Sequence, residues 1–377
     1  MHEFVSIFNS LITYAVFFVV AVIFSIVINS LFLRFFKTLG IRNNADGTVI
    51  RWGTLSKPSV GGITFYIIFL LSMACFSILF EPTQRLYHYE FVGLLLCCAS
   101  GFLIGLADDA YDTKPILKFG IQVLCGIILI ASGVSIHLTH YVLLNYLFTI
   151  FWVVGIMNSI NMLDNMDGIT TIVSAGIVIN TIYVIILHRD FNNVHLLALT
   201  GVLASLIAFL YFNWNPSSMY MGDTGSQFLG AFLATMGIIY FWNDGYAVHT
   251  PSQGKLICNA VMTFILPILD TTVVVVNRLG RGQSPFVGGK DHTTHSLAYL
   301  GLKDRQVAWV FISLSLCSLS LNIMIHRFLF AWSHFYTLSF AGYFFFLLVF
   351  FFYATRHKII KQRELLQSQS KSELIGR

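Results

Sequence analysis

Eleven apolar stretches recur along this 377-residue chain, each close to the ~20 residues that a helix needs to cross a bilayer. They cover approximately residues 11–33, 60–80, 91–107, 119–137, 142–162, 169–187, 193–212, 225–242, 256–277, 307–325 and 330–353. Only 10% of the residues are charged, whereas soluble domains carry about a quarter. Short alternating strands, typical of membrane barrels, are not found. The sequence therefore predicts an all-α, polytopic integral membrane protein with about 10–11 transmembrane helices.

The distribution of Lys and Arg predicts the orientation. Of 22 such residues, 18 fall on one set of alternate loops, and Arg85, Arg189, Lys255 and Arg327 fall on the other. Because cytosolic loops are rich in Lys and Arg, we expect the N-terminus outside and the C-terminus in the cytosol. The expected domains are one transmembrane unit over 1–353 and a charged cytosolic tail over 354–377. The active-site loops of the transmembrane unit would be 34–59, 107–118, 163–168, 213–224 and 278–306.

Carboxylates interrupt the apolar pattern at three places on the cytosolic side. They are Asp108 and Asp109 at the end of the third stretch, Asp164 and Asp167 after the fifth, and Asp223 before the eighth. Charged side chains at a membrane edge are costly unless they face a bundle interior or a wet cavity. Adjacent carboxylates also repel one another unless a cation lies between them. These residues are therefore predicted to form a site, and Mg²⁺ with a phosphate substrate fits their chemistry.

The fifth stretch ends with Asn158, Asn161, Asp164 and Asp167, spaced three residues apart. If the helix continued through them, they would share one face. An amide network between helices is the structural alternative. Asp223 lies between two glycines at a helix start, which suits a backbone nest that holds Mg²⁺ against a diphosphate. A plain capping role for Asp223 or Ser226 is the alternative there.

Basic residues accompany the carboxylates. Lys57 precedes Gly61-Gly62, where free N–H groups at a helix start could bind an anion, although close helix packing also explains two glycines. One loop carries four residues that could contact an anionic nucleotide, namely Arg278, Arg281, His292 and His295. The spacing of the two histidines would also fit zinc, but further zinc ligands are lacking. Asp270, inside the ninth stretch, suits a structural partner and a site residue equally.

Taken together, these motifs resemble the polyprenyl-phosphate N-acetylhexosamine-1-phosphate transferases. That family includes the enzymes that start O-antigen, enterobacterial common antigen and wall teichoic acid synthesis, and the phospho-MurNAc-pentapeptide translocase. The matching segments are Lys57-Pro58 with Gly61-Gly62, Asp108-Asp109, 161–168, 221–226, and Ser284-Pro285-Phe286 leading to His292 and His295.

The resemblance implies transfer of a sugar-1-phosphate from UDP-HexNAc to undecaprenyl phosphate, with release of UMP, in a cytosolic groove open to the lipid. It implies dependence on Mg²⁺, with Mn²⁺ as an alternative. It also implies a place in the bacterial inner membrane and no nucleic-acid partner, and leaves open whether the protein forms a homodimer. Residues and resemblance together predict catalytic roles for Asp108, Asp109, Asp164, Asp167 and Lys118, metal binding by Asp223 and Asn161, and substrate binding by Lys57, Asn158, Arg278, Arg281, His292 and His295.

Two departures from the family pattern concern the donor sugar. The usual Asp-Gly-x-Asp-Gly reads Asp164-Asn165-Met166-Asp167-Gly168, and the usual His-x-His-His reads His292-Thr293-Thr294-His295. Three adjacent histidines would mark the MurNAc-pentapeptide branch, so a GlcNAc-type donor is favoured.

Two other classes compete with the transferase. An ion- or proton-coupled transporter would use intramembrane carboxylates, but the acids gather at one face rather than at the midplane, and no repeated halves occur. An intramembrane aspartyl protease would share Tyr111-Asp112 and Gly222-Asp223, but it would leave the other carboxylates unexplained.

Overall fold

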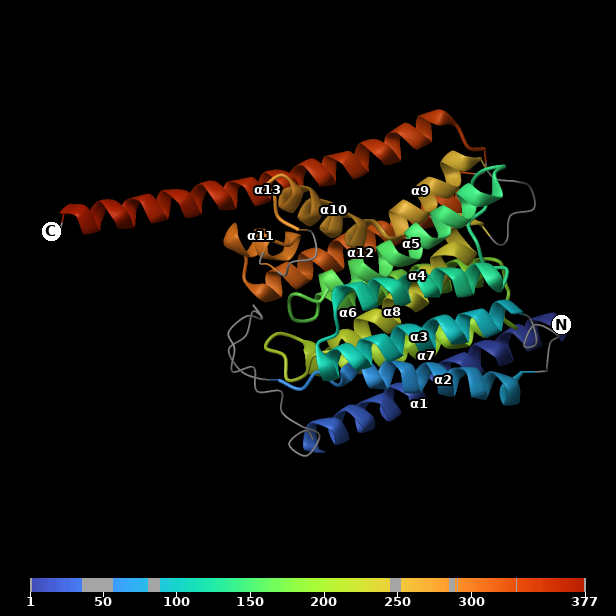
Figure 1. The fold of residues 1–377 in the computed structure, drawn as a ribbon. Helices are drawn as coiled ribbons and strands as arrows, with labels where there is room; N and C mark the ends of the chain where they lie inside the picture. Colours follow the sequence, from blue (N-terminus) through green and yellow to red (C-terminus); the bar gives the residue numbers. More distant parts are fainter. Residues whose placement is uncertain are drawn as a thin grey trace.

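The computed structural model describes residues 2–35, 57–80, 89–244, 252–284, 289, 291–329 and 331–375, without the side chains of 2–8 and 357–375. Several sequence features fall outside this description, namely the Lys and Arg residues of 36–56, Arg85, Pro285-Phe286, Lys290 and the basic side chains of 357–377. Within the described residues all regular structure is helical (Figure 1).

The helices follow one another as α1 (His2–Phe35), α2 (Gly61–Leu79), α3 (Tyr89–Tyr111), α4 (Pro115–Ala131), α5 (Val142–Leu163), α6 (Ile169–Leu187), α7 (Val194–Asn213), α8 (Gly222–Gly237), α9 (Gln253–Thr263), α10 (Ile265–Leu279), α11 (Thr293–Tyr299), α12 (Asp304–Arg327) and α13 (His334–Ile375). A short π-helix, η3 (Ile238–Trp242), continues α8.

Every predicted apolar stretch coincides with a helix, but two differ from a simple span. Among the described residues, nine helices are long and apolar enough to cross a membrane, and a bent pair adds a tenth. The stretch 119–137 corresponds to α4, which has only 17 residues because the chain turns at Gly133, in the left-handed region. The chain is thus a polytopic integral membrane protein, as predicted.

The predicted span 256–277 is broken. It forms α9 and α10, which meet at Phe264 with a bend of 81°. Pro267 explains the break, since it has no N–H to donate and its ring conflicts with the carbonyl four residues earlier. The bend turns α10 toward the polar end of the bundle.

Helix α8 lies in the centre of the bundle, packed against α2, α3, α5 and α6. Of the 18 residues in its apolar stretch, 94% are buried inside the protein, compared with 22% in α1 and 17% in α13. Small residues allow this packing: a side chain on Gly62 would collide with the backbone of Gly225, so α2 and α8 approach closely only because both positions are glycine.

The segments that carry the polar motifs meet at one end of the bundle. This end lies opposite the N-terminus and contains α11, and α13 projects beyond it (Figure 1). The grouping that the sequence predicted for these loops is therefore present in the fold.

Candidate active site

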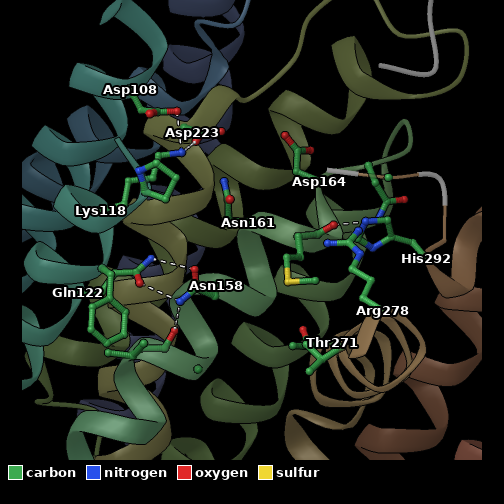
Figure 2. Close-up of a pocket in the computed structure, with 18 of the residues that line it drawn as sticks. Asp108, Lys118, Gln122, Asn158, Asn161, Asp164, Asp223, Thr271, Arg278 and His292 are labelled. Atoms are coloured by element: carbon green, nitrogen blue, oxygen red, sulfur yellow. Dashed lines mark hydrogen bonds and ion pairs between the residues drawn. The ribbon is translucent and has the colours of Figure 1, made fainter. Parts of the chain in front are cut away.

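A cavity of about 1140 Å³ opens at this end, between α3, α4, α5, α8, α10 and α11. Most predicted site residues line it: Asp108, Lys118, Asn158, Asn161, Asp164, Asp167, Asp223, Arg278, His292 and His295. Asp109, Lys57 and Arg281 are not among the lining residues. Figure 2 shows two polar walls that face each other, with Asn161 between them.

The first wall is built around Lys118, at the start of α4. Its ammonium group lies 2.7 Å from Oδ2 of Asp108 and 2.5 Å from Oδ2 of Asp223 (Figure 2). Asp108 is further fixed by Thr113, whose N–H and hydroxyl both donate to its Oδ1. One ammonium between two carboxylates leaves a net charge of −1, so this acidic cluster of Asp108, Lys118 and Asp223 favours a further cation.

Asp109 faces away from this wall and holds the first turn of α8. Its carboxylate accepts hydrogen bonds from the N–H of Asp223 (3.0 Å), the N–H of Thr224 (2.9 Å) and the Thr224 hydroxyl (2.7 Å). Gly222 is required here because it adopts φ +71° and a side chain would collide with Asp109. The prediction that these backbone N–H groups form a nest for Mg²⁺ and a diphosphate is therefore wrong, because the N–H groups of Asp223 and Thr224 already donate to the carboxylate of Asp109. The cap of α8 is Asp109 rather than Asp223 or Ser226.

Two amide side chains of α5 are oriented by partners on neighbouring helices. Asn158 exchanges hydrogen bonds with Gln122 of α4 (2.8 and 3.2 Å), and Gln122 also reaches Gln227 of α8. Asn161 donates to the hydroxyl of Ser226 (2.9 Å). The amide network considered as the structural alternative is thus real for Asn158, which nevertheless lines the cavity.

The prediction that Asp164 and Asp167 lie on the helical face of Asn161 is wrong. Helix α5 ends at Leu163, and the chain turns through Asp164 before α6 begins after Gly168 at φ +79°. Both carboxylates reach the cavity from this turn. Asp167 accepts hydrogen bonds from the N–H (3.0 Å) and hydroxyl (2.8 Å) of Ser217, so it joins the α5–α6 turn to the α7–α8 loop.

Lys57 supports the same loop from outside the cavity. Its ammonium group donates to the hydroxyl of Ser217 (3.0 Å) and lies 5.2 Å from the ring centre of Tyr220. The N–H groups of Gly61 and Gly62 donate to the carbonyls of Tyr220 and Met221. The anion-binding interpretation of this helix start is therefore wrong, and the packing alternative describes it.

The second wall is basic. Arg278 binds Asp291 through two nitrogens, at 3.0 and 2.7 Å, and Arg281 reaches the same carboxylate at 2.6 Å. Burial disfavours the charged carboxylate, but the hydrogen bonds and charges of both arginines prevail and lower the pKa of Asp291 to about 2. Two guanidinium groups on one carboxylate leave a net charge of +1. This basic cluster of Arg278, Arg281 and Asp291 favours an anion.

His292 lies beside Arg278 and is held by Asp270, a fully buried residue of α10. Nδ1 of His292 is 2.9 Å from the Asp270 carboxylate, which also accepts from the N–H (2.8 Å) and hydroxyl (2.6 Å) of Thr293. The structural-partner role expected as one option for Asp270 is thus observed. Gln122, Ser217 and Asp291 were not singled out from the sequence. Gln122 and Ser217 owe their places to partners far along the chain, and Asp291 owes its place to two arginines 13 and 10 residues away in the chain.

The sequence model of glycosyl transferase family 4 matches residues 91–241, a segment that includes Asp108, Lys118, Asn161 and Asp223. A phospho-N-acetylmuramoyl-pentapeptide-transferase of Streptococcus uberis is 30% identical over 233 residues, which are 55% of this chain and 67% of that protein. The chain belongs to glycosyl transferase family 4.

Two other relatives carry different names. A probable undecaprenyl-phosphate N-acetylglucosaminyl 1-phosphate transferase of Bacillus subtilis is 27% identical over 260 residues, 66% of this chain and 67% of the relative. A decaprenyl-phosphate N-acetylglucosaminephosphotransferase of Mycobacterium leprae is 27% identical over 281 residues, 66% of this chain and 68% of the relative. The chain is therefore a member of the polyprenyl-phosphate sugar-1-phosphate transferases, a conclusion that disfavours the transporter and protease alternatives.

Proposed function

We propose that this protein transfers a HexNAc-1-phosphate from a UDP-sugar to undecaprenyl phosphate and releases UMP. The observation that carries the proposal is the pairing of two oppositely charged walls across one cavity. The acidic cluster around Lys118 suits a cation with phosphate oxygens, and the basic cluster around Arg278 suits an anionic nucleotide.

The reaction forms one phosphorus–oxygen bond and breaks another. An oxygen of the lipid phosphate attacks the phosphorus that carries the sugar, and the bond to the bridging oxygen breaks, so UMP leaves with the electron pair. Because two anions must meet, the protein has to offset their repulsion with fixed positive charge. Lys118 on one wall and Arg278 with His292 on the other are placed to do so.

Asp108 is placed to accept a proton when the lipid phosphate binds in its protonated form. Its Oδ2 faces Lys118, while its Oδ1 is occupied by Thr113. Asp164 and Asp167 both border the cavity, and Figure 2 shows Asp164 on the side of Arg278 and His292, where the nucleotide would bind. In this account Asp109 and Lys57 act as positioning residues, because both bind other parts of the protein rather than line the cavity.

The residues present fit a magnesium ion that is shared with the substrate. Among the described residues, no three His, Cys, Asp or Glu side chains form a ready-made metal site. Mg²⁺ instead commonly binds one or two carboxylates together with substrate phosphates. Asp223 would supply the carboxylate and Asn161 its carbonyl oxygen, since the Asn161 nitrogen donates to Ser226. When bound, Mg²⁺ would neutralise charge on the diphosphate.

An apolar surface continues the cavity toward the lipid. Phe119 of α4, Phe151 of α5 and Val276 of α10 line it, and their side chains are exposed on the outside of the bundle by 43%, 78% and 50%. A polyprenyl chain could therefore lie between these helices and present its phosphate to Lys118. The 18 to 4 distribution of Lys and Arg supports placing this end in the cytosol, as expected for an enzyme of the bacterial inner membrane.

The names of the relatives do not agree on the donor sugar, since one is named for GlcNAc and another for MurNAc-pentapeptide. We favour GlcNAc or a related HexNAc, because Thr293 and Thr294 stand where the second branch would have histidines.

The test is turnover of a panel of UDP-HexNAc donors by the purified protein with undecaprenyl phosphate and Mg²⁺. UMP release should require both substrates and stop on addition of EDTA. Asp223→Asn should abolish it, whereas Asp190→Asn, at the opposite end of the bundle, should not. Lack of UMP with every donor, or near-normal turnover by Asp223→Asn, would contradict the proposal.

A further inference from the structure

Two consecutive threonines at the start of α11 bind to different parts of the fold. Thr293 donates through its hydroxyl and its N–H to Asp270 of α10. Thr294 donates through its hydroxyl to Oδ1 of Asn165, in the α5–α6 turn, at 2.5 Å. Both threonines are buried, with exposed fractions of 2% and 0%. The first turn of α11 is therefore tied on both sides.

Asn165 is itself fixed by the turn in which it lies. Its Nδ2 donates to the carbonyl of Met162 (2.9 Å) while its Oδ1 accepts from Thr294. The side chain thus spans from the end of α5 to the start of α11, two segments 129 residues apart in the chain. Asn165 also lines the cavity, as do His292 and His295 on either side of the threonine pair.

The two residues of this contact are the ones at which the chain departs from the resembled family pattern. Asn165 stands in place of a glycine and adds a side chain, whereas Thr294 stands in place of a histidine and is smaller. The Thr294 hydroxyl bonds to the Asn165 side chain, so the two differences from that pattern meet at one place beside the cavity.

We propose that the hydrogen bond between Asn165 and Thr294 is a determinant of donor selectivity. It sets the spacing between the α5–α6 turn and the α11 turn, and thereby decides which UDP-linked HexNAc fits between them. The inference rests on the proposed function and adds to it a named pair of selectivity residues. We expect the lipid phosphate to be unaffected, because the apolar residues proposed to hold the prenyl chain lie on α4, α5 and α10, whereas the pair joins the α5–α6 turn to α11.

The experiment compares kcat/KM for UDP-GlcNAc and its 4-epimer UDP-GalNAc in the full-length protein. The variants are Asn165→Ala, Thr294→Val and the double variant. Each single variant should change the ratio of the two kcat/KM values by about fivefold, the effect of one neutral hydrogen bond. The double variant should change it no further, since both substitutions remove the same contact. KM for undecaprenyl phosphate should stay within roughly twofold of the wild type.

Two controls separate selectivity from folding. Thr170→Val makes the same substitution at a buried threonine of α6 outside the cavity, whose hydroxyl has no hydrogen-bond partner among the described residues, and should leave the donor ratio unchanged. Thr294→Ser keeps the hydroxyl and should retain the wild-type ratio. An unchanged ratio in Thr294→Val and Asn165→Ala, or fully additive effects in the double variant, would overturn the inference. A wild type that turns over no UDP-HexNAc would instead overturn the proposed function on which it rests.

Discussion

The carboxylate of Asp109 and the backbone N–H of Asp223 are joined by a hydrogen bond of 3.0 Å, across two helices and 114 residues of sequence. Through this contact and its bonds to Thr224, Asp109 fixes the helix start that presents Asp223 to the cavity. The two adjacent carboxylates of α3 therefore have different tasks. Asp108 lines the cavity, and Asp109 orients the residue proposed to bind the metal.

Asp109→Asn should lower both stability and activity, because an amide cannot offer two acceptor oxygens to the N–H groups and hydroxyl of this turn. We expect a loss of about 1–2 kcal/mol in the free energy of unfolding, typical of a lost helix cap. Thermal unfolding in detergent measures it. Asp112→Asn, one residue beyond the end of the same helix, serves as the control for stability. Equal stability of the two variants would show that Asp109 is not a cap.

Lys118→Met should lower kcat by about 10²- to 10³-fold, the effect of losing a group that stabilises developing charge. The loss would leave Asp108 and Asp223 without the ammonium group between them. Lys118→Arg should recover only part of the rate, since a planar guanidinium does not replace a compact ammonium. Turnover at saturating substrates measures both, with Lys255→Met at the other end of the bundle as control. Retained turnover in Lys118→Met would exclude this role.

Asp270→Ala should be strongly destabilising. It removes the acceptor of three buried donors, namely Nδ1 of His292 and the N–H and hydroxyl of Thr293. Each unsatisfied donor costs about 1–3 kcal/mol, so we expect at least ~3 kcal/mol in the free energy of unfolding. Asp270→Asn keeps the shape and should be milder in stability yet at least ~10-fold slower in turnover, because it disturbs the orientation of His292. Equal turnover of Asp270→Asn and the wild type would argue against a positioning role.

The basic cluster should lose its stabilising effect only in acid. The pKa of Asp291 is lowered to about 2 in the fold, whereas an unfolded Asp has a pKa of about 3.9. A lowered folded-state pKa gives a stabilisation that is complete above about pH 4 and is lost as the pH falls toward 2. The stability difference between wild type and Asp291→Asn should therefore be constant from pH 5 to 8, at roughly 2–3 kcal/mol, and shrink below pH 4. A difference that changes near neutral pH would contradict the charge pairing in this cluster.

The spans and the shared polar end could be predicted from the sequence because both depend on local composition. Apolar runs of about 20 residues form helices wherever they lie in a membrane, and each polar motif falls at the end of such a run. The site residues Asp108, Asn161 and Asp223 were predicted for the same reason, and Lys118 was predicted with the help of the family resemblance; all four line the cavity.

What the sequence could not predict depends on contacts between distant segments. Asp108 and Asp109 are neighbours in the chain, but a helix turns them about 100° apart, and only the position of α8 decides which one faces the cavity. Asp164 and Asp167 leave the helical face of Asn161 because Asp167 is bound by Ser217 from the α7–α8 loop. Asp270 could not be assigned a role because His292 lies 22 residues away.

The identity of the nucleotide that is released tests the proposed reaction most directly. Purified protein, undecaprenyl phosphate, Mg²⁺ and the best UDP-HexNAc donor should give UMP and a lipid product that carries HexNAc on two phosphates, in equal amounts by chromatography and mass spectrometry. This result requires cleavage between the two phosphorus atoms of the donor, as the facing acidic and basic clusters predict. Release of UDP with a lipid product that carries a single phosphate, or no nucleotide release at all, would contradict the proposed reaction.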